Sequence, residues 1–370
     1  MTVLKVLSFL AGAVIVLLTL FSAIRATILP RAVNNRLGRF SIRVVRAGTH
    51  VWTGRAPGDE SRDRVMAMFG PMVLLVMLVG WLVLIVSGYM LIFLGRGEPS
   101  VRKALELSGS SIFTLGTVPT RGLVNDLLSF SEAGIGLLLV TLLITYLPSI
   151  YSAFARRENG VARLRVRAGT PPSAAGMLIR YHRIDGANVR LIGVWQTWES
   201  WFVDVEESHT SFPILAYFRS PQPTESWITA AGTLLDTAAM WQAVVVHPPD
   251  PNVQLCIRAG FQALQRIADS QQIPYNNNPS PTDPVTISRE EWDESVEEMA
   301  AAGVPIVADR DAAWEAWKGW RVNYDTILLD LARLVEAPPV PWVSDRSPLP
   351  DSPSRRLHRA RRVLSRGDNA

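Results

Sequence analysis

The chain has 370 residues, 48% of them hydrophobic, and a formal net charge of +4 at pH 7. The hydrophobic residues are concentrated in long uncharged segments, which predicts an α-helical integral membrane protein. The single cysteine, Cys256, excludes an intrachain disulfide, and its expected role is that of a small buried apolar residue.

Three segments are long enough to cross a bilayer as helices, for which about 20 apolar residues are needed. The first, residues 3–24, carries one charge, whereas residues 65–95 and 133–155 carry none. A cleaved signal peptide is the alternative for the first segment, because Phe21-Ser22-Ala23 resembles a weak cleavage site. The apolar run is long for a signal peptide, and the basic residues that follow it oppose translocation. We therefore expect an uncleaved first transmembrane helix over residues 1–27.

The distribution of arginine predicts the orientation in the membrane. Residues 25–64 contain nine Arg against three acidic residues, and five Arg against one Glu follow the third apolar segment. Positive charge favours the cytoplasmic side, so both regions are expected there, with the N-terminus outside. Residues 28–69 then form a basic cytoplasmic loop, and residues 96–132 face outward from the cell (plasma) membrane. Since topology explains the positive charge, no nucleic-acid partner is expected.

The region after the third apolar segment predicts a separate domain. Residues 159–344 carry apolar residues at helical spacing, which is typical of a mostly helical cytoplasmic domain. Helices are expected over residues 186–207, 227–246, 252–270 and 312–335, with a loop over 275–284 and a capping box over 288–291. Residues 345–370 are rich in Pro, Ser and Arg, and predict a basic disordered tail that can reach anionic lipid headgroups.

Residues 107–120 lie between the second and third apolar segments and contain no charged residue. They are too few to cross the membrane as a helix, yet too apolar for an ordinary exposed loop. A hairpin that enters the membrane and returns fits both facts, since non-helical backbone at membrane depth needs surrounding protein or a water-filled cavity. Ser100 is a suitable N-cap for a short helix over residues 101–113. The alternative is an extracellular loop with a short amphipathic helix.

The end of this short helix resembles the signature of the pore-loop potassium-channel superfamily, Thr-x-x-Thr-x-Gly-Tyr-Gly. The chain has Ser111-x-x-Thr114-Leu115-Gly116-Thr117-Val118, in which Thr117 and Val118 replace the family's Tyr and second Gly. The resemblance covers about residues 71–158, in the order outer helix, pore helix, filter-like segment and inner helix.

This resemblance implies a channel-like pore module over residues 70–158. It also implies a homotetramer in the lipid bilayer, because each chain supplies one pore loop, and conduction of monovalent cations, with K⁺ as one candidate. The residues implied to form the ion pathway are Thr114, Leu115, Gly116 and Thr117, with Ser111 as support from the pore helix. We expect residues 114–117 to be extended so that their carbonyls can face an ion, and Gly116 to help because it tolerates backbone angles that other residues avoid.

Three residues of the inner helix are candidate gating hinges. Gly134 and Gly136 lie near its outer end, and Pro148 lies near its inner end. Gly and Pro are also common in ordinary transmembrane helices, which is the alternative explanation.

No pattern in the sequence indicates an enzyme, a cofactor or a metal site. The histidines at 182, 209 and 247 lack metal-ligand spacing, and no phosphate-binding or nucleophile motif is present. Tryptophan recurs at every third residue in two stripes, Trp195, Trp198 and Trp201, and Trp314, Trp317 and Trp320. We expect these stripes to pack helices together; a ligand-binding aromatic box or contact with the membrane interface are the alternatives.

Three functions therefore remain open. The leading hypothesis is a cation-conducting pore. The second is a non-conducting, channel-derived scaffold or signalling protein that acts through its cytoplasmic domain. The third is a membrane-anchored enzyme or sensor, for which no sequence motif was found.

Overall fold

A computed structural model describes residues 2–27, 36–53, 68–185, 191–350 and 352–353 of the chain. These residues are mostly helical, and the one strand-like pairing among them is an isolated bridge between Val245 and Ile306. Three helices are long and apolar enough to cross a membrane: Val3–Thr27, Phe69–Gly95 and Leu123–Ala168. They coincide with the three apolar segments, so the prediction of a helical protein with three candidate spans is confirmed.

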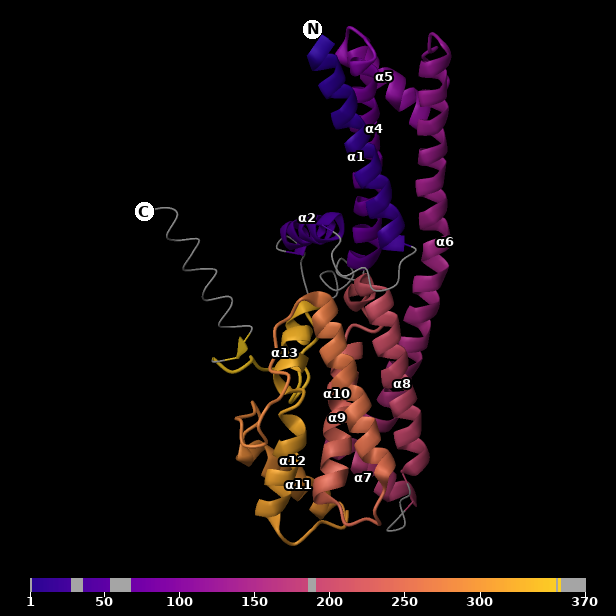
Figure 1. Cartoon of the computed structure of the whole chain (residues 1–370). Helices are drawn as coiled ribbons and strands as arrows, with labels where there is room; N and C mark the ends of the chain where they lie inside the picture. The colour runs from indigo at the N-terminus through magenta and orange to yellow at the C-terminus, as the bar shows by residue number, and fades with distance from the viewer. Residues whose placement is uncertain (1, 28–35, 54–67, 186–190, 351, 354–370) are drawn as a thin grey trace, which may run out of the picture. The chain divides into compact units, whose positions relative to one another are not determined.

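The chain divides into two compact units, Met1–Ser152 and Ala153–Ala370. The helices of the first unit are α1 (Thr2–Thr27), α2 (Arg36–Thr53), α4 (Phe69–Gly95), α5 (Val101–Ile112) and the first part of α6 (Leu123–Ala168). In this unit α1 and α4 lie side by side over most of their length, as Figure 1 shows.

Glycine allows α1 and α4 to approach closely. A Cβ atom on Gly12 of α1 would lie 2.4 Å from the carbonyl oxygen of Gly88 on α4. A Cβ atom on Gly95 would lie 2.6 Å from the carbonyl oxygen of Lys5, so the two helices run antiparallel. Small residues commonly serve this purpose between membrane helices, where lipid removes the hydrophobic driving force for association.

Within the segment 28–69, the structure contains a helix that the sequence analysis did not predict. This helix, α2, packs on α4, and Leu37 lies 3.2 Å from the position of a Cβ atom on Gly80. Its outward face combines arginine with exposed Phe40 and Val44. Helices that carry both arginine and exposed apolar side chains are typical of segments that lie in the membrane interface.

The second unit is an all-helical bundle around α9 (Trp227–Val244), nearly every residue of which is buried. Its other helices are α7 (Ala174–Asp185), α8 (Ile192–Ser211), the short 3₁₀ helix η2 (Pro213–Tyr217), α10 (Pro251–Gln271), α11 (Arg289–Ala301), α12 (Arg310–Arg321) and α13 (Asp325–Leu334). Helices α7, α8, α10, α12 and α13 all contact α9 (Figure 1). A helix that is apolar on all sides is expected at the centre of a bundle.

Most of the helices expected in this unit are present, with two differences. The prediction of a single helix over residues 312–335 is wrong, because α12 ends at Arg321 and α13 begins at Asp325. A turn separates them, in which the amide of Tyr324 donates to the carbonyl of Arg321 at 3.1 Å. Helix α7 was not predicted, and residues 186–190, expected to begin a helix, lie outside the described residues.

Three sequence predictions for the second unit are confirmed: the capping box, the buried cysteine and the packing of the tryptophans. Ser288 Oγ accepts from the amide of Glu291 at 3.2 Å, and Glu291 Oε2 accepts from the amide of Ser288 at 2.9 Å, which completes the capping box. Cys256 is buried and free. The tryptophans of both stripes pack in or against the core, namely Trp195, Trp198, Trp201, Trp314, Trp317 and Trp320.

The start of the expected tail is attached to this core. Arg346 Nη2 donates to Glu291 Oε1 at 2.9 Å, and Arg346 Nη1 donates to the carbonyl of Thr286 at 3.0 Å. The Arg346 guanidinium lowers the pKa of the Glu291 carboxyl. The prediction of disorder concerns residues 345–370, of which 351 and 354–370 lie outside the described residues.

Candidate pore site

The short helix expected at the pore is present as α5, Val101–Ile112. At ~1.5 Å per residue it is about 18 Å long, which is too short to cross a bilayer core of about 30 Å. Ser100 occupies the N-cap position with an extended backbone, but its side chain makes no capping hydrogen bond. The expected position of the cap is therefore right, and the expected side-chain contact is absent.

Contacts along α5 show how it lies against its neighbours. Ser108 Oγ is 3.1 Å from the carbonyl oxygen of Val86 on α4. At the other end of α5, the carbonyl oxygen of Ile112 lies 2.7 Å from the position of a Cβ atom on Gly136 of α6. Gly136 is about 20 Å along α6 from Leu123 at ~1.5 Å per residue. Helix α5 thus runs down between α4 and α6, and residues 113–122 return to the start of α6 (Figure 1).

The segment after α5 does not continue as an extended strand, which corrects the expectation for residues 114–117. Thr114 and Gly116 have left-handed backbones, with φ of 53° and 65°. The amide of Thr114 donates to the carbonyl of Ser111 at 3.0 Å, and the amide of Leu115 donates to the carbonyl of Ser110 at 2.8 Å. This pair of bonds forms a Schellman cap, which satisfies carbonyls that the end of a helix leaves without donors.

Ser110, which the sequence analysis did not select, ties the loop back to α5. Its Oγ accepts from the amide of Thr117 at 3.0 Å and from the amide of Val118 at 3.3 Å. Residues 114–117 remain exposed in the single chain despite these bonds. A serine one turn before the end of a helix often makes only local bonds, so its sequence position gave no signal of this role.

Ser111 was expected to support the pore helix. Its Oγ donates to the carbonyl of Leu107 at 2.8 Å and lies 2.5 Å from Ser129 Oγ on α6. Ser111 is buried, so this contact ties α5 to α6 away from solvent. The structure therefore brings Ser111 to the helix–helix contact, while Thr114, Leu115, Gly116 and Thr117 lie together in the exposed loop beyond it.

The most unusual side chain of the site is Glu132 of α6, which is fully buried. Its Oε1 is hydrogen-bonded to Ser108 Oγ, and its Oε2 has no hydrogen-bond partner among the residues that the structure describes. The Ser108 hydroxyl has a single proton, so it cannot donate to Glu132 and to the carbonyl of Val86 at once. Buried carboxyl groups within membrane helices are costly and usually functional.

Sequence reasoning missed Glu132 because it directly precedes the third apolar segment, at the end of residues 96–132, which were expected to face outward. The structure begins this helix at Leu123, ten residues before the apolar segment, so Glu132 lies more than two turns inside α6. Its neighbour Ser131 is held by Tyr89 of α4, with 2.7 Å between their hydroxyl oxygens. Polar contacts therefore join α6 to both α4 and α5 at this level.

The three candidate hinges have different surroundings. Gly136 is a packing position, because a side chain there would meet Ile112 of α5. No described atom lies within 4 Å of a Cβ built on Gly134. Pro148 lies inside α6, which remains helical on both sides of it. The hinge hypothesis stays a prediction for all three residues.

No group of three or more His, Cys, Asp or Glu side chains that could hold a metal ion is found among the residues that the structure describes. Comparisons with known proteins give one further finding. The chain is 27% identical over 239 residues to an uncharacterized membrane protein, YdjJ, of Bacillus subtilis strain 168, covering 61% of this chain and 68% of the relative. No family model matches the chain, and no solved structure matches it. The similarity and the three apolar helices agree on a helical membrane protein.

Proposed function

We propose that the chain is a channel-like membrane protein in which α5 and the loop after it form part of a pore for monovalent cations. The observation that carries this proposal is the half-length helix α5, held between α4 and α6 with an exposed loop at its end. In a bilayer, this arrangement would be a re-entrant hairpin whose exposed loop faces a water-filled pore between chains, an environment in which non-helical backbone is tolerated at membrane depth.

The charge distribution supports cations as the conducted species. The C-terminal end of α5 carries the negative end of the helix dipole, and no basic residue lies in its last turn. Each chain contributes one such loop, so the proposed pore is a homotetramer in the plasma membrane. In the proposed topology the N-terminus lies outside and the second unit in the cytoplasm, because arginine-rich segments favour the cytoplasmic side.

A non-conducting scaffold is the second candidate, and one observation favours it. The Schellman cap uses the carbonyls of Ser110 and Ser111, and Ser110 Oγ also holds Thr117 and Val118. These bonds hold residues 114–118 in a turn, whereas a filter needs carbonyl oxygens aligned along the ion path to replace the hydration shell. In this case the second unit would carry the function.

Flux measurements on the purified full-length protein in liposomes separate the two candidates. We expect K⁺ or Na⁺ flux without Cl⁻ flux, and its loss in Gly116→Val, because a β-branched residue resists a φ of 65°. Gly109→Ala is the matched control, since no described atom lies within 4 Å of a Cβ there and alanine suits a helix. The double change Thr117→Tyr and Val118→Gly is expected to raise the preference for K⁺ over Na⁺. Absence of any flux from correctly inserted protein would leave the scaffold as the function.

A further inference from the structure

Buried hydroxyl groups join α4, α5 and α6, and the direction of their hydrogen bonds can be assigned by counting protons. The hydroxyl of Ser131 donates to the carbonyl of Leu128 at 2.7 Å. Its oxygen must therefore accept from the hydroxyl of Tyr89, also at 2.7 Å, because a serine has one hydroxyl proton. On α5, the hydroxyl of Ser111 donates to the carbonyl of Leu107 at 2.8 Å. In these contacts each proton has an acceptor and no further proton is needed.

Ser108 is the exception, because its one proton faces two acceptors. Its Oγ lies 3.1 Å from the carbonyl oxygen of Val86 on α4 and is also hydrogen-bonded to Glu132 Oε1 on α6. A carbonyl and an ionised carboxylate can only accept, so the two contacts together need a second proton. A protonated Glu132 supplies it: the carboxyl O–H donates to Ser108 Oγ, and the Ser108 hydroxyl donates to the carbonyl of Val86.

The surroundings of Glu132 also favour a neutral carboxyl group. Its side chain is fully buried, and Oε2 has no hydrogen-bond partner among the residues that the structure describes. The ionisable groups of the neighbouring helices are Tyr89 on α4, Arg102, Lys103 and Glu106 on α5, and Asp126 within two turns on α6. Arg102 pairs with Glu106 at 2.8 Å and Lys103 is exposed, so neither cation compensates Glu132. An uncompensated buried carboxylate is so costly that such groups neutralise instead.

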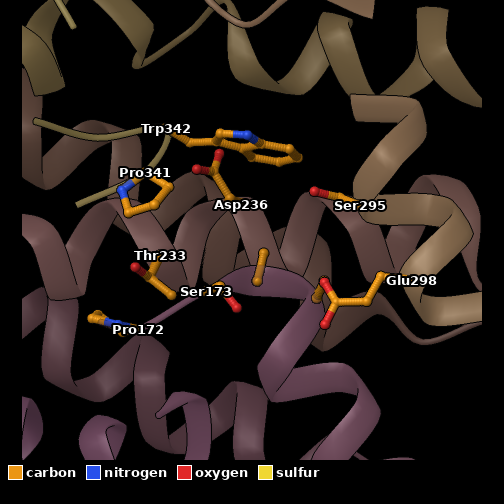
Figure 2. A pocket seen from close by; sticks show the side chains of 10 residues that line it. Pro172, Ser173, Thr233, Asp236, Ser295, Glu298, Pro341 and Trp342 are labelled. Atoms are coloured by element: carbon orange, nitrogen blue, oxygen red, sulfur yellow. The ribbon is translucent and has the colours of Figure 1, made fainter. Parts of the chain in front are cut away.

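Asp236 of the second unit shows the contrasting case of a buried carboxyl group with a cationic partner. It lines a small pocket of about 60 Å³, together with Trp342 and residues of α7 and α11 (Figure 2). Each of its two carboxylate oxygens lies 2.7 Å from Arg321 Nη1, and its Oδ1 also accepts from the hydroxyl of Tyr324 at 2.8 Å. Glu132 has no comparable guanidinium among the described residues, and a proton is small enough to compensate it without a cavity.

We propose that Glu132 is a proton-binding site, and that the bound proton completes the contact by which Ser108 holds α5 to α4 and α6. When the proton is released to water, a carboxylate remains between three helices. The Ser108 hydroxyl then donates to this carboxylate, and the contact with Val86 is lost. Because α5 carries the loop of the proposed pore, proton release at alkaline pH loosens the support of that loop. The control of conduction rests on the proposed function, whereas the proton site does not.

Infrared spectroscopy of the purified full-length protein tests the proton site without any flux measurement. A protonated carboxyl group has a C=O band that an ionised carboxylate lacks. At neutral pH we expect the wild type to show a band of this kind that is missing in Glu132→Gln. The difference between the two proteins isolates Glu132, since burial raises the pKa of Asp236 and a band from Asp236 would be common to both.

Two further variants test the assignment of the band and its contact. Glu106→Gln is the matched control, because Glu106 is exposed and paired with Arg102, and its removal should leave the band unchanged. Ser108→Ala should keep the band but shift it to higher frequency, because the carboxyl O–H loses its acceptor. Ser87→Ala, which removes a serine of α4 bonded within its own helix, should not shift it. Circular dichroism of every variant establishes that the helices are intact.

Flux in liposomes tests the coupling to the pore. We expect wild-type flux to fall at alkaline pH and the flux of Glu132→Gln to persist, because glutamine keeps a donor for Ser108 and cannot ionise. Flux that responds to pH alike in both proteins would overturn the coupling. The proton site is overturned if the wild type and Glu132→Gln have the same C=O band, or if Ser108→Ala leaves that band unshifted. Absence of all flux would contradict the pore, and the infrared result would still decide the proton site.

Discussion

Ser108 of α5 and Glu132 of α6 are hydrogen-bonded to each other, and both side chains are fully buried. The same Ser108 hydroxyl lies 3.1 Å from the carbonyl of Val86 on α4, so one oxygen joins three helices. Together with the contact between Ser111 and Ser129, this contact holds α5 at a fixed position along α4 and α6.

Ser108→Ala is therefore expected to destabilise the first unit. The change leaves both carboxyl oxygens of Glu132 without a hydrogen-bond partner among the described residues, at a cost of about 1 kcal/mol, within the ~0.6–1.7 kcal/mol range of hydrogen bonds between membrane helices. Thermal unfolding of the purified protein in detergent measures the effect. Ser87→Ala is the control, since Ser87 Oγ donates to the carbonyl of Val83 in its own helix at 2.7 Å. Equal stability of both variants would show that the Ser108 contact is unimportant.

Two glycines of α6 distinguish close packing from hinge motion. Gly136→Ala places a Cβ atom 2.7 Å from the carbonyl oxygen of Ile112, so α5 must shift. We expect a loss of about 1–3 kcal/mol, typical of overpacking, together with reduced flux if the protein conducts. Gly134→Ala is expected to be neutral or slightly stabilising, because no described atom is within 4 Å and alanine favours helix. If Gly134→Ala reduces flux as strongly as Gly136→Ala, flexibility rather than packing is the requirement.

The buried position of His209 predicts that the second unit loses folding stability in mild acid. Burial, and next the charge of Arg157, lower the pKa of His209 well below its usual value of 6.5. The unfolded chain therefore binds a proton that the folded chain excludes, and stability falls as the pH drops below about 6.5, by at most about 1.4 kcal/mol per pH unit. Denaturant unfolding at a series of pH values measures this slope, and His209→Gln should flatten it. An unchanged slope in His209→Gln would assign the acid sensitivity to another group.

The proposed topology places Thr53 and Asn125 on opposite sides of the membrane. The prediction follows from the arginine excess in residues 25–64 and from the single crossing expected between the two positions. Single cysteines introduced at each position in a Cys256→Ala background can be labelled with an impermeant maleimide in intact cells. Only the cysteine at 125 should react before lysis. Labelling of both from the same side would contradict the topology and the pore together.

Apolar length and helical spacing were sufficient to predict the three spans and α5, because a bilayer-length apolar run admits few other structures. The prediction from helical spacing was wrong over residues 312–335. There the apolar periodicity continues through the turn at 322–324 and hides the change of direction between α12 and α13. Helix α2 was missed because its arginines suggested a loop.

The details of the candidate site depend on contacts between residues distant in the chain. Gly116 was selected for backbone freedom, and its positive φ agrees with that reason. The Schellman cap at Thr114 was not foreseen, because threonine rarely adopts a left-handed backbone. Glu132 and Ser108 are 24 positions apart, and only the packing of α5 on α6 brings them together. No local pattern encodes such a pair.

The glycine contacts between α1 and α4 bear on what happens if the N-terminal segment is removed. Gly88 and Gly95 offer no side chain of their own, and the surface they leave on α4 is filled by Gly12, Phe9 and Val16 of α1. If α1 were removed by a processing protease or by truncation of the gene, the backbone of α4 at these glycines would be exposed to lipid. Acyl chains pack poorly into such a backbone groove, so the truncated protein should associate with other helices or be degraded.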